Sequence, residues 1–215
     1  TVLSRGLGDV YKRQFTALVN LLGPAKSVYS QSRTVYKKRI IGSGSRKDEE
    51  VIVDIPTTLV SQIEFDNGAL IDSFFSFDTW KHNKNHIELY GDKGSINIPD
   101  PNTFGGSINI CTSKNGEWET IATDKNNLGK INIHNSKKTN ENPGIANYRG
   151  IGVSEMVDSI NNKRLNRCSG ELSLHVLDIL DTIIKSSEND KKLQLRSSIN
   201  EVSYFGEDEI SKLLN

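Results

Sequence analysis

The chain of 215 residues is poor in the residue patterns that mark secreted, metal-binding or membrane proteins. Its two cysteines, Cys111 and Cys168, lie far apart and form neither a Cys-x-x-Cys pair nor a zinc-ligand spacing. Its four histidines are scattered, without the Cys or Asp cluster that a metal site needs. No stretch is long and apolar enough to span a bilayer, and none reads as a secretory signal. We therefore expect a cytoplasmic protein with reduced cysteines and no metal ion.

The chain also lacks an excess of charge of either sign. Its 27 Lys and Arg residues balance 27 Asp and Glu residues. A nucleic-acid-binding domain usually carries a basic surface, whereas here the longest basic run, Lys37–Arg39, is followed by the acidic run Asp48–Glu50. Hydrophobic residues make up 35% of the chain, as in an ordinary globular protein with a core. We expect neither a nucleic acid nor a membrane as partner.

The first fourteen residues differ from the rest of the chain. They show no helical or strand periodicity and meet an apolar pattern at Phe15 without a capping residue. Residues 4–14 resemble the translation of a transposase-type sequencing adaptor. We therefore predict a non-native segment at 1–14, one domain at 15–200 and a C-terminal tail at 201–215. The alternative is a genuine flexible N-terminal arm.

Strand patterns fill the middle of the chain. Residues 57–65 and 69–77 both alternate, and the Asp-Asn-Gly sequence between them predicts an antiparallel hairpin. A second hairpin is predicted for residues 86–98, with its turn at Gly91–Gly94. Polar loops are expected at 42–50 and 124–144. Further strands are expected at 25–37, 107–111, 118–122 and 193–195.

Helical patterns come at both ends of this strand region. One helix should end at Gly23-Pro24, and others are expected at 148–162, from Ser169 onward and at 207–214. A run of strands followed by helices favours an α+β fold, with an open, mostly antiparallel sheet and helices packed on one face. The other face is then free to meet water, a ligand or another subunit.

Several short segments in this order are typical of one family. They are Leu21–Val28, Asp54–Thr57, Phe65–Gly68, His86–Gly91 with Lys93–Ser95, Asp100–Gly106, Asn147–Gly152 and Ser169–Glu171. Together they resemble the C-terminal domain of the Gfo/Idh/MocA oxidoreductases over roughly Phe15 to Ser197. The resemblance implies a parent enzyme with an N-terminal Rossmann domain that binds NAD or NADP. It also implies a sugar, inositol or related polyol as substrate, and homo-oligomers formed through the open sheet face.

The chain departs from this family in the residues that do the chemistry. It has no Rossmann fingerprint, because Gly42–Ser45 opens no predicted helix. The family's Glu-Lys-Pro and Asp-x-Gly-x-His/Tyr motifs are not found either. We therefore expect a fragment without catalytic, cofactor-binding or metal-binding residues, inactive alone. The alternative is a stand-alone, non-catalytic ligand-binding or oligomerisation module.

Four residues are candidates for substrate binding. Trp80 can stack on the C–H face of a sugar, and His82 can hydrogen-bond its hydroxyls. His86 is either a further contact or a structural histidine within a strand. Arg149, after the Asn- and Gly-rich loop, either binds an acidic or hydroxylated substrate or forms a surface salt bridge. His175 lies within the second long helix, and we expect it to be packed.

Overall fold

The structure is a computed structural model that describes residues 7–114, 116–134, 144–200 and 202–214. Two compact units form: the first takes residues up to His82 and Gly170–Val202, and the second takes Asn83–Ser169 and the residues from Ser203 onward. All named strands pair antiparallel in open sheets, and helices accompany them. The α+β prediction is confirmed. None of the described helices is long and apolar enough to cross a membrane.

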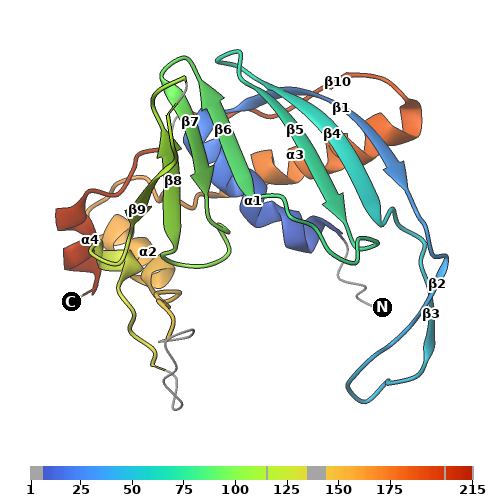
Figure 1. Cartoon of the computed structure of the whole chain (residues 1–215), viewed down its shortest axis with the longest axis horizontal. Coiled ribbons are helices and arrows are strands. Elements are labelled where there is room, and N and C mark those ends of the chain that lie inside the picture. Colours follow the sequence, from blue (N-terminus) through green and yellow to red (C-terminus); the bar gives the residue numbers. More distant parts are fainter. Residues whose placement is uncertain (1–6, 115, 135–143, 201, 215) are drawn as a thin grey trace. The chain divides into compact units, whose positions relative to one another are not determined.

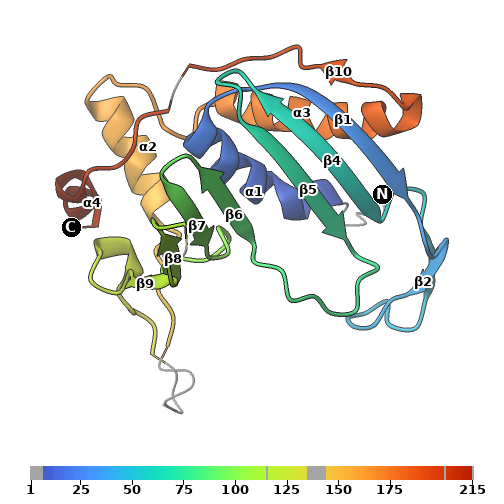
Figure 2. The ribbon, with the colours of Figure 1, turned by 45° about the horizontal axis from the view of Figure 1, so that its top comes forward.

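The first unit is a four-stranded sheet with two helices on one face. Its elements are α1 (Leu7–Leu22), β1 (Ala25–Arg33), β2 (Lys38–Ile40), β3 (Glu50–Ile52), β4 (Thr58–Phe65), β5 (Leu70–Ser76), α3 (Gly170–Asn189) and β10 (Leu193–Gln194). The strand order is β10-β1-β4-β5. In Figures 1 and 2, α1 and α3 lie together behind this sheet, and β2 and β3 form a separate ribbon that extends beyond it.

The inner face of this sheet follows the alternation of β4. Leu59, Ser61, Ile63 and Phe65 are all buried, as the pattern predicts. Ile63 lies between Val28 of β1 and Ile71 of β5 in register, so the apolar row continues across three strands. The helix α3 covers this row with buried side chains one turn apart: Leu172, Val176, Ile179 and Ile183. Burial of each such side chain contributes about 1.5–3 kcal/mol.

The first helix begins earlier than the sequence suggests. It starts at Leu7, so the expectation that the chain is irregular before Phe15 is wrong from Leu7 onward. Tyr11 lies one turn before Phe15, and both are buried against Phe75, with ring centroids 3.7 Å and 5.4 Å away respectively. The apolar stripe of the helix therefore extends into the segment that resembles an adaptor. Residues 1–6 lie outside the described part.

The second unit has a sheet of its own. Its elements are β6 (Ile87–Gly91), β7 (Gly94–Ile98), β8 (Ser107–Cys111), β9 (Glu119–Ala122), the 3-10 helix η1 (Asn127–Gly129), α2 (Ile151–Asn161) and α4 (Glu207–Leu214). The strand order β6-β7-β8-β9 follows the sequence. The strands of the predicted open sheet are thus divided between two four-stranded sheets and a ribbon. Of the predicted loop at 124–144, residues 135–143 lie outside the described part.

Charged side chains join the helices of the second unit. Glu155 of α2 is 3% exposed and accepts hydrogen bonds from both terminal nitrogens of Arg164, at 2.7 and 2.6 Å. Arg167 also binds Glu155, at 3.2 Å, and reaches Glu209 of α4 at 2.8 Å. Ile210 of α4 is buried, so the predicted C-terminal tail contains a packed helix.

Candidate functional site

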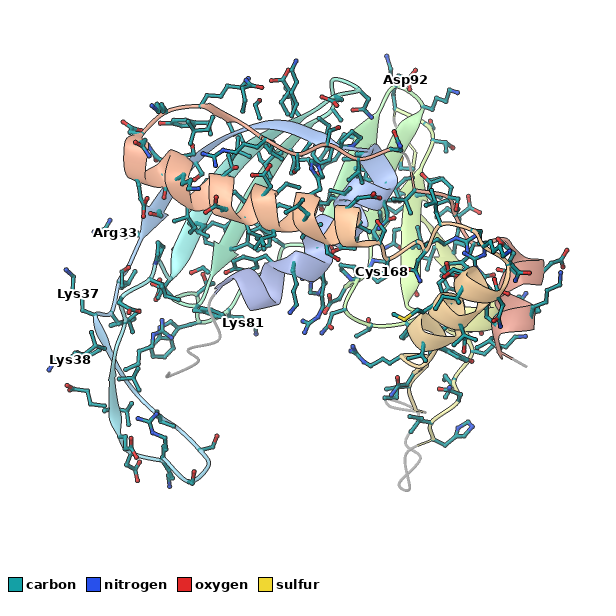
Figure 3. The ribbon with its side chains drawn as sticks, turned by 180° about the vertical axis from the view of Figure 1, so that it is seen from behind. Arg33, Lys37, Lys38, Lys81, Asp92 and Cys168 are labelled. Atoms are coloured by element: carbon teal, nitrogen blue, oxygen red, sulfur yellow. The ribbon has the colours of Figure 1, made fainter. Side chains whose placement is uncertain are left out.

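The four predicted substrate-binding residues fall in different parts of the fold. Trp80 and His82 belong to the first unit, in the connection that follows β5, where Figure 3 labels the intervening Lys81. Both are exposed, and Trp80 has 96% of its surface free. His86 and Arg149 belong to the second unit, where each lines a different cavity.

Asp78 anchors the connection that carries Trp80. Its carboxylate accepts hydrogen bonds from the hydroxyls of Thr57 and Thr58, at 2.6 and 2.7 Å, and pairs with Arg39 at 2.7 Å. Burial by itself would raise the pKa of Asp78, but these hydroxyl hydrogen bonds and the guanidinium lower it. The group stays ionised and ties the base of the ribbon to the ends of β4 and β5. Nothing in the local sequence predicts this role.

His86 lies at a polar cavity of about 300 Å³. Its lining residues are Lys84, Asn85, His86, Asn97, Ile98, Pro99, Ser107 and Asn109. The register pairs Glu88, Asn97, Asn109 and Thr120 in one row across the four strands, so this sheet face carries amides, a carboxylate and a hydroxyl. Such groups hydrogen-bond the hydroxyls of a polyol.

One polar atom of a residue that lines this cavity lacks a hydrogen bond within the described part of the chain. The Oδ1 atom of Asn97 is buried and has no partner among the described residues. Its neighbour in the row, Asn109, accepts a hydrogen bond from Thr120 at 2.8 Å. Glu88 is held by the hydroxyl of Tyr90 and by the amide of Asn85, at 2.7 Å for the latter, and these hydrogen bonds lower the pKa of Glu88. A buried oxygen left without a hydrogen bond is costly to the fold.

Arg149 lies at a larger cavity of about 610 Å³. Its guanidinium donates to the backbone oxygen of Asn102 at 3.0 Å and remains exposed to solvent. Two positions of this cavity require glycine, because the backbone of another segment approaches each of them closely. A Cβ on Gly129 would lie 1.9 Å from the Thr123 oxygen, and one on Gly144 would lie 2.3 Å from the Ile133 oxygen. The cavity wall is therefore built from tightly packed backbone.

His175 is a structural residue. It is fully buried, its Nε2 atom accepts the backbone N–H of Ala25 at 3.0 Å, and its Nδ1 atom lies 2.9 Å from the hydroxyl of Ser197. That hydroxyl donates to Asp178 at 2.8 Å. Burial lowers the pKa of His175, so the ring stays neutral. The serine stands between histidine and aspartate, which is not the order of a catalytic triad. The prediction of a packed histidine is confirmed.

Metal ligands do not gather anywhere in the described ranges, where no group of three or more His, Cys, Asp or Glu side chains is placed to hold an ion. Both cysteines are free.

Residues 14–195 match the model of the Gfo/Idh/MocA oxidoreductase family, C-terminal alpha/beta domain. The chain belongs to this family. The resemblance carried by the short segments is thereby confirmed. No protein of curated function matches the chain in sequence.

Solved structures of this family share the fold. The apo form of levoglucosan dehydrogenase is 18% identical with a TM-score of 0.68, and the match covers 90% of this chain and 51% of that one. The same enzyme in complex with NADH and L-sorbose gives 18% identity, a TM-score of 0.65 and coverage of 89% and 50%. An NAD binding oxidoreductase from Klebsiella pneumoniae gives 16%, 0.64, and 87% and 50%. The chain thus spans about half the length of these relatives.

Proposed function

We propose that this chain is the substrate-binding domain of a cytoplasmic, NAD(P)-dependent oxidoreductase that acts on a CH–OH group of a sugar, inositol or related polyol. The observation that carries the proposal is the family match over residues 14–195. The polar cavity at His86 supports the substrate class, because its amides, imidazole and ammonium group suit hydroxyls. Relatives were solved with levoglucosan and with glycerol. The two free cysteines support a reducing compartment.

The described residues do not fit a nicotinamide dinucleotide. The Gly-rich stretch Gly42–Ser45 lies between β2 and β3 and opens no helix, so it offers no helix N-terminus for a pyrophosphate. We propose that the other half of a longer protein holds NAD or NADP. In this proposal residues 15–200 form the substrate-binding domain, residues 4–14 derive from an adaptor, and the 215-residue chain neither binds NAD(H) nor catalyses the reaction.

Within this domain we assign substrate contacts to four side chains. His86 would hydrogen-bond hydroxyls beside the unpaired oxygen of Asn97. Trp80 is almost fully exposed, so its indole is free to stack on a sugar face, and His82 lies two residues away. Arg149 would contact a hydroxyl or carboxylate from the larger cavity.

A second candidate function is a stand-alone binding or oligomerisation module. The outer face of the first unit's sheet favours it, because Val60, Leu70 and Phe74 are 49%, 80% and 50% exposed there. Exposed apolar side chains of this kind, which alternate here with Gln62, Glu64 and Asp72, are stabilised by a partner surface. We propose that a second copy covers this face. Light scattering at increasing concentration tests this, and a mass that stays monomeric would contradict it.

The decisive experiment begins with the gene. The reading frame upstream of Phe15 should encode a Rossmann domain, and the full-length protein should reduce NAD⁺ or NADP⁺ with a sugar or inositol, followed by NAD(P)H absorbance. We expect His86→Ala and Trp80→Ala to raise KM at least tenfold. His134→Ala and Trp118→Ala are matched controls, because both residues are exposed and line neither cavity. A gene that begins near Phe15, or equal effects of the controls, would contradict the proposal.

A further inference from the structure

The helix α2 has its polar side buried and its apolar side exposed. Its buried residues are Glu155 and Ser159. The outward residues are apolar and follow the spacing i, i+3, i+4 and i+7; they are Val153, Met156, Val157 and Ile160, between 52% and 69% exposed. A surface helix of a globular protein normally turns such a stripe toward the core. We call these four side chains the α2 stripe.

The ion cluster explains why the polar side faces inward. Arg164 holds Glu155 through two parallel hydrogen bonds and pairs with Asp158 of the same helix at 2.5 Å. Arg167 links Glu155 to α4. Turning α2 to hide its stripe would break this bidentate pairing and move a paired carboxylate away from both guanidinium groups. The orientation of α2 is therefore fixed by the cluster, and the stripe remains available for a partner.

We propose that the α2 stripe is the docking surface for the cofactor-binding half of a longer protein. The proposal rests on the proposed function, which places NAD(P) on that other half. The relatives of this chain continue for as much again as the part it matches, since the match covers about 50% of their length. The matched region is the family's C-terminal domain. A further domain of that size needs a contact on this one, and the stripe is an apolar surface without a described cover.

The size of the stripe decides between this occupant and a second copy. The 11 residues of α2 extend about 16 Å at a rise of 1.5 Å per residue. A stable interface between separate proteins takes about 800 Å² from each partner, which four side chains of a short helix do not supply. A domain in the same chain needs less contact area, because the linkage supplies a high effective concentration.

The test uses this chain and the separately produced half encoded upstream in the same gene. Calorimetry at high protein concentration should show weak 1:1 binding, because the two halves meet here without the linkage that raises their effective concentration. The double variant Val157→Glu/Ile160→Lys should weaken it at least tenfold. Ile121→Lys on β9 is the control for the Ile160→Lys half of this variant, because it places a lysine on an isoleucine that is 45% exposed outside the stripe, and it should leave the affinity unchanged. Circular dichroism checks that each variant folds, and Val153→Ser, expected to weaken binding several-fold, replaces the double variant if it does not.

Three results would overturn the proposal. They are the absence of any complex, a complex that is insensitive to the stripe variants, and a dimer of this chain that the double variant dissolves. A gene without an upstream half would also overturn it. The proposed function can fail separately. A 1:1 complex that depends on the stripe but oxidises no polyol would contradict the proposed oxidoreductase activity and still support the docking surface.

Discussion

Replacing Glu155 with glutamine should destabilise the second unit by about 2–3 kcal/mol. The carboxylate side chain is 4% exposed and pairs with two arginines. The neutral amide leaves each guanidinium group with one remaining counter-ion, Asp158 for Arg164 and Glu209 for Arg167. Removing one partner of a buried ion pair costs roughly 3–5 kcal/mol. Arg164 and Arg167 keep 28% and 12% of their side-chain surface exposed, so water can solvate them in part and the expected cost falls to the bottom of that range or below it.

Tryptophan fluorescence can follow this unit by itself. The chain has two tryptophans, Trp118 in the second unit and Trp80 in the first. In a Trp80→Phe background, urea unfolding read by Trp118 therefore reports the second unit. In a thermal scan with the same fluorescence signal, the expected loss corresponds to a fall in midpoint temperature of roughly 8–24 °C for a unit of about 100 residues.

The effect of Glu155 should also depend on pH. The hydrogen bonds from Arg164, followed by those from Arg167, lower the pKa of Glu155. The unfolded carboxyl titrates near 4.3. The stabilisation is thus fully present above that pH and is lost as the pH falls through the lower folded value. The difference between the wild type and Glu155→Gln should shrink accordingly in acid.

The matched control for this prediction is Glu209→Gln. Glu209 pairs with the same Arg167, but its side chain is 46% exposed, so its loss should cost under about 1 kcal/mol. Equal effects of the two substitutions, or a change below about 1 kcal/mol for Glu155→Gln, would refute the reasoning that burial makes this carboxylate important for the stability of the second unit.

Four other substitutions test single features of the structure. Because burial lowers the pKa of His175, the unfolded chain binds a proton below about pH 6.5 that the folded chain does not. The wild type should therefore lose stability as the pH falls below that value, and urea titrations should show a flatter dependence for His175→Gln. Gly129→Ala places a Cβ 1.9 Å from a backbone oxygen and should cost about 3 kcal/mol in thermal unfolding, whereas Gly152→Ala, with open space around it, should gain about 0.5–1 kcal/mol. Tyr11→Phe removes a buried hydroxyl without a partner in the described ranges and should stabilise the first unit by about 1–2 kcal/mol in urea, and a loss instead would show that the hydroxyl is satisfied.

Local patterns predict the parts of this fold that local chemistry determines. The hairpin of β4 and β5 is an example: Asn67 accepts the N–H of Ala69 at 2.9 Å, and Gly68 takes the positive φ of 86° that the turn requires. The turn and the alternation around it are both contained in about twenty consecutive residues. The helix ended by Gly23 follows in the same way, because Gly23 has a φ of 82° and its N–H binds the Val19 oxygen at 2.9 Å.

Features that depend on distant partners could not be predicted. The strand expected at 25–37 ends at Arg33, where Thr57 pairs with its backbone and the ribbon begins. Alternation alone does not show which strands share a sheet, so it could not predict the division into two sheets. The candidate site shares this limit: the His86 cavity depends on Asn97 and Asn109 from two other strands, and neither carries a signal of its own.

The helix α2 shows why periodicity predicts a helix more reliably than its buried side. The apolar spacing from Val153 to Ile160 places the helix correctly, since a period of 3.6 requires only that one side be uniform. The direction of that side depends on what competes for the interior. Here Glu155 takes the interior position, because Arg164 and Arg167 from the segment just after the helix bind it there. An apolar stripe left outward by a buried ion cluster is a stronger sign of a missing partner than exposed leucines scattered over a surface, because the cluster holds the stripe in place whether or not the partner is bound.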